Sequence, residues 1–378
     1  MSGTAKHYIS LFTGAGGLDI GFNEAGFHGL LASDIMPQAK ETFILNYPDE
    51  PYLLEDIRTL SISEIKKYVG DKKVSVIIGG PPCQGFSNMG NKNSADPRNM
   101  LFESYVKIVD AIRPTCFLFE NVKGLRTMFE GRYFKKVIEG FLAIGYNLHC
   151  ALVDTSNYGV PQKRERIIIF GTMLDKQFLF PVFNADSFGR ITAYKNVGEA
   201  INDLTDKGEE VPNHIALNHS DIVVRRYGKY KNHQPPKHNK VVTERFSYIQ
   251  EGKKMDIDTL PEHLKLGSKT GKPVSNFSHV FFRLDRKKPA PTIVPGHNAL
   301  PVHPTLNRTL TIREAARIQT FPDEFEFVGP IINQCLQVGN AFPCIVGQML
   351  GDRLRTIVNK QWDTDRATTL AKKSMLVR

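Results

Sequence analysis

The chain has 378 residues, of which 41% are hydrophobic and 23% charged, a composition typical of a globular protein with a full core. No segment approaches the roughly 18 unbroken apolar residues of a membrane-spanning helix, and the first residues lack the apolar core of a signal peptide. The 49 Lys and Arg outnumber the 39 Asp and Glu, giving a net charge of +10, which favours a polyanionic partner such as nucleic acid. The five cysteines never form a C-x-x-C pair, so we expect no zinc site and no disulfide framework.

Short apolar runs alternate with amphipathic stretches through the first half of the chain. This alternation predicts a doubly wound, mostly parallel α/β sheet. The predicted strands are His7–Phe12, Leu30–Ser33, Tyr52–Leu54, Val74–Ile78 and Cys116–Phe119, and the predicted helices are Gly17–Ala25, Pro37–Asn46, Ile62–Val69, Asn99–Ile112 and Tyr133–Ile144. Two further strands, Asn147–Val153 and Arg166–Gly171, follow with no helix between them, which predicts an antiparallel hairpin at one edge of the sheet.

The regular alternation stops near residue 175. Residues 181–300 are rich in proline, histidine and lysine, and we expect them to form a smaller, irregular, β-rich domain between 1–180 and 301–378. Regularity returns with a helix over Leu310–Thr320, where Thr311 and Glu314 have the spacing of a capping box. A last helix is expected from Pro343 to about Val358.

Polar or glycine residues follow the carboxyl ends of five predicted strands. The first strand leads into residues 12–17, and the later ones into Asp34, Asp56, the segment 79–87 and Glu120. In an open parallel sheet, ligands bind beyond the carboxyl ends of the strands. We therefore expect all five segments to line one crevice.

Cys83 lies in the segment Gly79-Gly80-Pro81-Pro82-Cys83-Gln84-Gly85-Phe86-Ser87. The two prolines fix φ and remove two N–H donors, so they hold the segment extended. A cysteine within an apolar run is usually a structural core residue. The flanking Pro, Gln, Gly and Ser indicate instead a thiol presented for chemistry.

The glycine loop departs from the dinucleotide-binding pattern G-x-G-x-x-G, because Asp19 stands at the third glycine position. Gly14, Gly16 and Gly17 would still let a ligand approach the backbone closely. Asp34, about 20 residues on, is placed to bind ribose hydroxyls. The loop fits adenosine without a pyrophosphate, as in S-adenosylmethionine, better than NAD. A tight turn that serves only packing is the alternative.

Three charged residues are candidates for the chemistry. Glu120 ends an apolar run, where desolvation would raise the carboxyl pKa and make it a proton donor, although a carboxylate that caps the next loop is the alternative. Arg164 and Arg166 share a face if their segment is extended. They could aim guanidinium groups at the crevice, or form a solvated basic edge.

Taken together, six segments from both ends of the chain resemble the C5-cytosine DNA methyltransferases in order and spacing. They are Leu11–Gly17, Pro81–Gln84, Glu120–Val122, Gln162–Arg166, Arg313–Gln319 with Phe321–Asp323, and Gln337–Ala341. The resemblance implies the class I S-adenosylmethionine methyltransferase fold. It makes 1–180 and 301–378 the catalytic and cofactor-binding domain, and 181–300 the target-recognition domain.

The resemblance also implies a covalent mechanism. Cys83 would add to C6 of a cytosine flipped out of the duplex, while Glu120 neutralises charge at N3 of the ring. Arg164 would bind the ring carbonyl, and Arg166 would help to fix this network. C5 would then take the methyl group of S-adenosylmethionine before Cys83 is expelled. The base that removes the C5 proton is left open.

By the same resemblance, the cofactor pocket has eleven residues. Phe12 and Ile35 would hold the adenine, with Ile35 replacing an aromatic side chain. Asp34 would bind the ribose, and Asp56 with Ile57 the adenine edge. The full set is Phe12, Gly14, Gly16, Gly17, Asp34, Ile35, Asp56, Ile57, Leu101, Asn340 and Ala341.

The candidate DNA contacts are mostly basic. Residues 88–100 have the length and polarity of a loop that could close over the base. Residues 225–240 hold six Lys and Arg and no acid, which suits phosphate contact, although a solvated loop is the alternative. The candidates are Lys92, Arg98, Arg225, Arg226, Lys229, Lys231 and, in a Thr-hydrophobic pair typical of the recognition domain, Thr292. The DNA sequence that the protein recognises does not follow from the chain, because base contacts in such a domain come from irregular loops.

The leading hypothesis is a DNA (cytosine-5) methyltransferase of the restriction–modification type, acting on double-stranded DNA as a monomer. We expect a cytoplasmic, nucleoid-associated, prokaryotic or phage protein with no metal, and whether a restriction endonuclease is its functional partner is left open. The tRNA-methylating branch of the family is the first alternative, but its Cys-Phe-Thr tripeptide is missing around Phe277. A catalytically silent DNA-binding homologue and a nicotinamide oxidoreductase are the others. The complete catalytic set argues against the former, and the altered glycine pattern against the latter.

Overall fold

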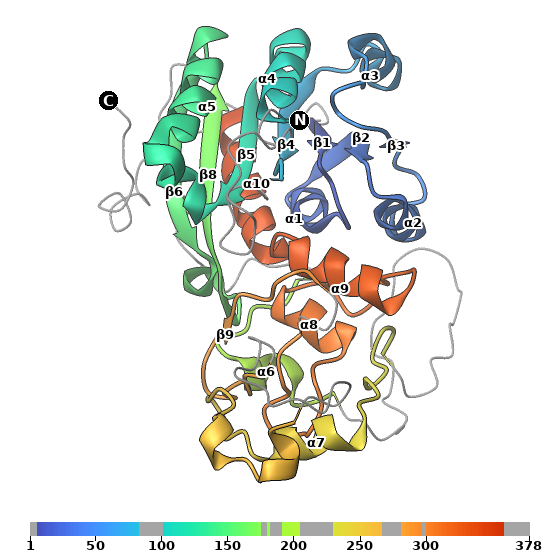
Figure 1. Ribbon diagram of the computed structural model, residues 1–378. Coiled ribbons are helices and arrows are strands. Elements are labelled where there is room, and N and C mark those ends of the chain that lie inside the picture. Colours follow the sequence, from blue (N-terminus) through green and yellow to red (C-terminus); the bar gives the residue numbers. More distant parts are fainter. Residues whose placement is uncertain are drawn as a thin grey trace.

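A seven-stranded sheet forms the centre of the computed structural model, which describes residues 6–82, 101–174, 180–181, 191–204, 230–266, 281–296 and 300–358. The strand order is β3-β2-β1-β4-β5-β8-β6 (Figure 1). Strands β1 to β5 are parallel, and β8 runs antiparallel to both β5 and β6. Their bounds are β1 Lys6–Leu11, β2 Phe27–Asp34, β3 Tyr52–Leu54, β4 Val74–Gly79, β5 Cys116–Val122, β6 Asn147–Asp154 and β8 Glu165–Thr172. The doubly wound, mostly parallel sheet with an antiparallel edge hairpin is therefore confirmed.

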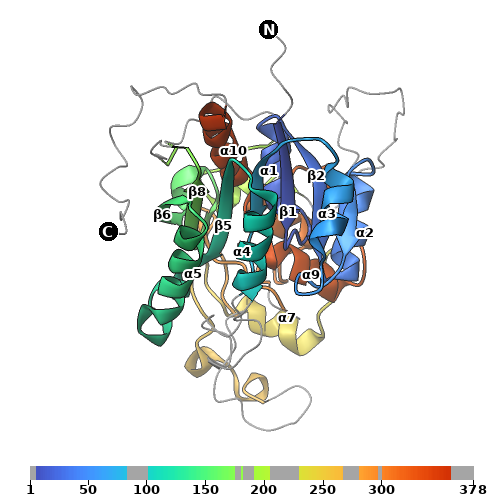
Figure 2. The same cartoon turned by 90° about the horizontal axis from the view of Figure 1, so that it is seen from above.

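Helices cover both faces of the sheet, as Figure 2 shows. Successive side chains of a strand point to opposite faces. In β1, Tyr8 packs in the apolar cluster that includes α1 and α10, whereas Ile9 packs with α3, α4 and α5. The helices are α1 Gly17–Glu24, α2 Pro37–Asn46, α3 Ile62–Val69, α4 Leu101–Ile112, α5 Arg132–Ala143 and α10 Cys344–Val358. Two covered faces explain why β4 is buried throughout and reads as an unbroken apolar run.

A second group of short elements lies beyond the carboxyl ends of the parallel strands (Figure 1). Thr311 and Glu314 form the predicted capping box at the start of α8. The longer helix α9 was not predicted from the sequence. The elements are β7 Gln162–Lys163, α6 Val197–Ile201, α7 Lys240–Ser247, β9 Ala290–Pro291, α8 Ile312–Ile318 and α9 Ile331–Asn340, with 3-10 turns at Lys123–Arg126, Met128–Gly131, Thr155–Tyr158, Ile257–Thr259 and Glu262–Leu264.

The described part of the region 181–300 is irregular, as expected, whereas the β-rich character that was also expected is not seen in that part. In its described part, the only named strand is the two-residue β9, which pairs with β7. The apolar cluster around α1 and α10 continues through Ile293, Leu300 and α8, so these segments share one core with the sheet. The domain boundaries near residues 180 and 300 stay a prediction.

Candidate active site

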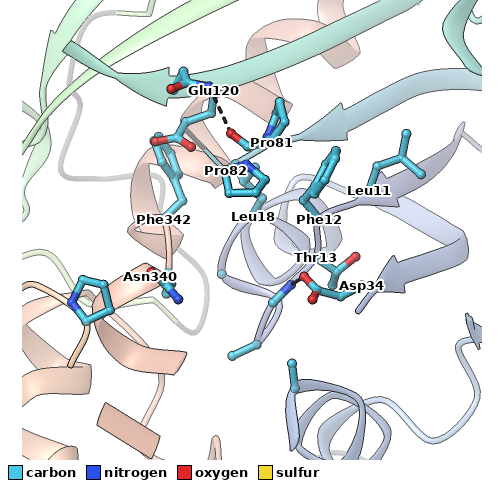
Figure 3. A pocket seen from close by; sticks show the side chains of 18 of the residues that line it. Leu11, Phe12, Thr13, Leu18, Asp34, Pro81, Pro82, Glu120, Asn340 and Phe342 are labelled. Carbon is cyan, nitrogen blue, oxygen red and sulfur yellow. Dashed lines mark hydrogen bonds between the residues drawn. The ribbon is translucent and has the colours of Figure 1, made fainter. Parts of the chain in front are cut away.

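A cavity of about 1020 Å³ lies at the carboxyl ends of the parallel strands (Figure 3). Its other walls come from residues 292–295 and 337–342, which follow more than a hundred residues later in the chain. Ten of the eleven predicted cofactor residues line it, Gly16 being the exception: Phe12, Gly14, Gly17, Asp34, Ile35, Asp56, Ile57, Leu101, Asn340 and Ala341. Glu120, Arg164, Arg166 and Thr292 line the same cavity.

The loop after β1 holds Phe12 in a left-handed conformation, with φ of 55°. Such a backbone is rare for a bulky aromatic residue and costs about 1–3 kcal/mol, so its surroundings must enforce it. The main chain supplies part of that constraint, because the Thr13 N–H donates to the Ser33 carbonyl at 3.1 Å. The Gly14 N–H donates to Asp34 Oδ2 at 2.8 Å. The end of β2 therefore fixes the loop that carries the Phe12 ring.

Asp34, the residue predicted to bind ribose, lines the cavity at the end of β2. Besides the bond from Gly14, its Oδ1 accepts the Met36 N–H at 3.0 Å. Burial raises the pKa of Asp34, and these N–H donors oppose that rise. Each carboxylate oxygen has a second lone pair, so the group can still accept hydroxyl hydrogens from a ligand. Beside it, the Ile35 side chain is 61% exposed and offers an apolar surface at the mouth of the cavity.

The three glycines of the loop serve different purposes. A Cβ on Gly14, whose φ is +56°, would meet nothing within 4 Å, so the space beside it is open to a ligand. A Cβ on Gly17 would lie 2.3 Å from the Phe342 carbonyl oxygen. One on Gly16 would lie 3.0 Å from the ring of Phe43. All three were expected from the sequence to serve ligand approach, which stays a prediction; Gly17 lines the cavity and also packs tightly, and the φ of +86° at Gly16 favours glycine there.

Glu120 and Arg166 form an ion pair at the opposite side of the cavity. Arg166 Nε lies 2.7 Å from Glu120 Oε1, and the two side chains are 13% and 16% exposed. Arg166 is in register with Val122, two residues from Glu120, so the pair is a diagonal contact across β5 and β8. The cavity therefore holds a largely desolvated carboxyl group whose orientation is set by a guanidinium.

The same carboxyl group lies against the segment that leads to Cys83. A Cβ on Gly80 would be 2.5 Å from Glu120 Oε2, so a larger residue there would displace the carboxyl group from Arg166. The next residue of β5, Asn121, donates its side-chain N–H to the Pro81 carbonyl at 3.1 Å. Figure 3 shows Glu120 beside Pro81 and Pro82. The residue immediately before Cys83, Pro82, thus lines the cavity with the predicted acid.

Six predicted residues lie outside the described part of the chain. They are Cys83, Lys92, Arg98, Arg225, Arg226 and Lys229.

Arg164 is almost fully buried, with 2% of its surface exposed. Its guanidinium donates to the carbonyls of Ile293 and Gly339 at 3.2 Å and of Asn340 at 3.3 Å. Nε has no hydrogen-bond partner among the described residues. Burial lowers the pKa of Arg164, the charge of Arg166 lowers it further, and Glu120 opposes both. Arg164 therefore ties two later segments, at residue 293 and residues 339–340, to its place in the cavity wall, and its Nε–H has no partner in the described part of the chain.

The two described candidates for DNA contact differ in position. Thr292 lines the cavity, and its hydroxyl donates to the Lys163 carbonyl at 2.8 Å. Lys231 is not part of the lining, and its ammonium pairs with Glu326. Contact of either residue with DNA stays a prediction.

Two basic residues of the cavity were not predicted from the sequence. Arg58 donates from Nε to both carboxylate oxygens of Asp56, at 3.0 and 3.1 Å, and this bond lowers the pKa of Asp56. Lys123 pairs with Glu165 at 2.9 Å. Arg58 and Lys123 each lie within three positions of a predicted site residue. The neighbouring sequence, however, does not indicate that their side chains line the same cavity.

The described part of the chain contains no group of three or more His, Cys, Asp or Glu side chains that could hold a metal ion. Nor does it contain a helix long and apolar enough to cross a bilayer.

A mostly parallel sheet of this order, with its cavity at the strand ends, defines the class I methyltransferase fold. A crystal structure of an E. coli prophage protein assigned as a DNA modification methyltransferase superposes with a TM-score of 0.73 and 26% identity, over 94% of this chain and all of that one. A DNMT2 mutant from Spodoptera frugiperda, at 16% identity over 93% of this chain and 100% of that one, has a TM-score of 0.59 and shares the fold.

The family described as C-5 cytosine-specific DNA methylase matches residues 7–356. The type II methyltransferase M1.HphI of Haemophilus parahaemolyticus is 35% identical over 352 residues, 91% of this chain and 85% of that protein. M.DdeI of Desulfomicrobium norvegicum is 34% identical over 92% of this chain and 88% of its own length. The chain belongs to the C-5 cytosine-specific DNA methylase family, and it is a DNA (cytosine-5) methyltransferase.

Proposed function

We propose that the protein transfers the methyl group of S-adenosylmethionine to C5 of a cytosine in a specific duplex site, through a covalent bond between Cys83 and C6. It would act in the bacterial cytoplasm as the modification enzyme of a restriction–modification system. The observation that carries the proposal is the position of Glu120: its carboxyl group abuts Gly80 and shares a cavity with Pro82 and the glycine loop. This proximity supports a site in which the acid, the nucleophile and the cofactor act together.

The cofactor end of the cavity fits an adenosine ligand. Phe12 and Ile57 supply apolar walls, and Asp34 has lone pairs left for ribose hydroxyls. The open space at Gly14 can admit the methionine part of the cofactor, which carries the sulfonium. Asp56, oriented by Arg58, can accept from an exocyclic amine. When bound, S-adenosylmethionine supplies an electrophilic methyl group.

The other end fits a flipped base. The Cys83 thiolate would attack C6 and place the electron pair of the C5–C6 double bond on the ring. Glu120 would stabilise that charge by sharing a proton with N3, while Arg166 keeps the carboxyl group aimed. C5 then takes the methyl group, the C5 proton leaves to a base in the site, and elimination releases Cys83 with the double bond restored. A base stacked within the duplex cannot enter this cavity, so the cytosine must first turn out of the helix.

The carbonyls that hold Arg164 belong to the segments that complete this end of the cavity. We propose that Arg164 fixes the wall beside the base and offers its unpaired Nε–H to the ring carbonyl. The basic residues outside the described part, together with Thr292, would contact DNA, which makes binding strongly salt-dependent.

The test is trapping on duplex DNA that contains 5-fluorocytosine, after its methylation site is found by bisulfite sequencing in a methylation-free host. The wild-type chain should form a covalent adduct that resists denaturation, and Cys83→Ser should form none. Cys150→Ala, which changes a buried cysteine on β6, is the matched control and should still be trapped. Methyl transfer by Cys83→Ser at the wild-type rate would refute the mechanism. Transfer to tRNA but not to DNA would refute the substrate.

A further inference from the structure

A chain of buried hydrogen bonds runs behind the cofactor loop and ends at Asp19. The Ser33 N–H donates to Thr13 Oγ1 at 3.1 Å. That hydroxyl donates to Ser10 Oγ at 2.9 Å, and the Ser10 hydroxyl donates to Asp19 Oδ2 at 3.0 Å. Every bond points the same way, with the carboxyl group of α1 as the final acceptor. The chain links the ends of β1 and β2 to the first turn of α1.

Asp19 is a destabilising residue at this position. It is 1% exposed, and its second oxygen, Oδ1, has no hydrogen-bond partner among the described residues. A buried carboxyl group with one oxygen unpaired weakens the fold rather than strengthening it. The retained acid therefore calls for a role. The Tyr8 hydroxyl also contacts this carboxyl group, and the bond from Ser10 is the contact that leads to the loop after β1.

The hydrogen-bond chain that ends at Asp19 passes through Thr13, in the loop after β1. Thr13 stands between Phe12, whose left-handed backbone must be enforced, and Gly14, whose neighbouring space is open to a ligand. The Thr13 hydroxyl can also reach the Ser10 carbonyl at 3.2 Å. Without the acceptor at Asp19, the Ser10 hydroxyl is free to turn, and the Thr13 hydroxyl has two competing acceptors. The Thr13 hydroxyl then lacks one fixed orientation, and the loop is held only by the backbone bonds of Thr13 and Gly14 to the end of β2.

We infer that Asp19 is a positioning residue for S-adenosylmethionine, which acts through Ser10 and Thr13 to hold Phe12 and Gly14 at the cavity. This inference rests on the proposed cofactor. Burial and the charge of Glu50 raise the pKa of Asp19 to about 8, yet the oxygen that faces Ser10 accepts a hydrogen bond in either protonation state. An amide supplies the same acceptor, so Asp19→Asn should preserve the chain and Asp19→Ala should break it.

The experiment measures S-adenosylmethionine binding by calorimetry, together with kcat and the KM values for cofactor and DNA, on the full chain. Asp19→Ala and Ser10→Ala should each raise the Kd and KM for S-adenosylmethionine about tenfold, the loss expected for one hydrogen bond to a carboxyl group. Kcat at saturation and the KM for DNA should stay within about twofold. Asp19→Asn should bind as the wild type does. Ser75→Ala, which removes a buried hydroxyl from the adjacent strand β4, is the matched control and should change nothing.

The inference is overturned if Asp19→Ala binds the cofactor as tightly as the wild type, or if Asp19→Asn is as weak as Asp19→Ala. A parallel loss of kcat, of both affinities and of melting temperature would also overturn it, because it would show a structural role alone. If Asp19→Ala does not fold, the cofactor affinity of Ser10→Ala decides the question in the same way. Failure of the wild-type chain to bind S-adenosylmethionine would instead refute the proposed function.

Discussion

The ion pair between Glu120 and Arg166 allows a quantitative prediction. Arg166→Met keeps much of the side-chain volume but leaves the Glu120 carboxyl group without its charge partner. At the 2.7 Å separation of Arg166 Nε and Glu120 Oε1, the gross attraction is about 6 kcal/mol for an effective dielectric constant of about 20. Removing one partner of a buried pair costs about 3–5 kcal/mol. Because the side chains keep 13% and 16% exposure, we expect the lower end, about 3 kcal/mol.

The assay is urea unfolding at pH 7, followed by circular dichroism, for the wild type, Arg166→Met, Glu120→Gln and the double variant. The double variant should be more stable than Arg166→Met alone, because the amide removes the unpaired charge. The coupling free energy should reach about 2 kcal/mol. Lys135→Met, which breaks an exposed pair on α5, should cost less than about 0.5 kcal/mol. Strictly additive effects, or an Arg166→Met variant as stable as the control, would show that the pair does not orient the acid.

Three further predictions concern the cofactor end of the cavity. Gly17→Ala should lower the melting temperature clearly, because α1 must move about 1 Å to restore ordinary contact distances. Gly14→Ala should cost about 1–2 kcal/mol through its left-handed backbone and should also raise the KM for S-adenosylmethionine, whereas Gly17→Ala should leave that KM closer to the wild-type value; melting curves and steady-state kinetics separate the two. Arg58→Ala should raise that KM several-fold with kcat unchanged, since Asp56 loses its orienting donor, and equal kinetics would contradict this role. The pKa of Asp19 is raised to about 8 from 3.8, so the folded state holds the proton more tightly, and stability should fall by up to about 1.4 kcal/mol per pH unit as the pH rises through this window. Asp19→Asn should lack that slope in urea unfolding at pH 5, 7 and 9, and identical slopes would contradict the assignment.

Much of the fold could be predicted because each buried strand appears in the sequence as a short, continuous apolar run. A strand covered on both faces, such as β4, must be apolar along its whole length, and its burial in the structure explains the run from Val74 to Ile78. The position of the ligand site could also be predicted, because polar residues that directly follow such buried strands usually belong to a ligand site. The capping box at Thr311 was predicted from two residues three positions apart.

What could not be predicted depends on contacts between distant segments. Nothing near Arg164 in the sequence indicates that its guanidinium binds carbonyls of residues 293, 339 and 340. The glycine loop shows the same limit, because only the structure reveals that Gly17 faces the Phe342 carbonyl and Gly14 faces open space. Helix α9 could not be predicted because its burial does not follow its apolar residues: Ile331 and Ile332 are exposed, whereas Gln337 is buried.

The dependence of Arg164 on these late carbonyls has a consequence for biosynthesis. A nascent chain still attached to the ribosome at residue 300 would have its cofactor loop, its thiol and its acid, yet it would lack two of the three carbonyl groups that anchor the guanidinium. The cavity wall around Arg164 is therefore completed only after residues 339 and 340 have been synthesised, well after the strands of the sheet.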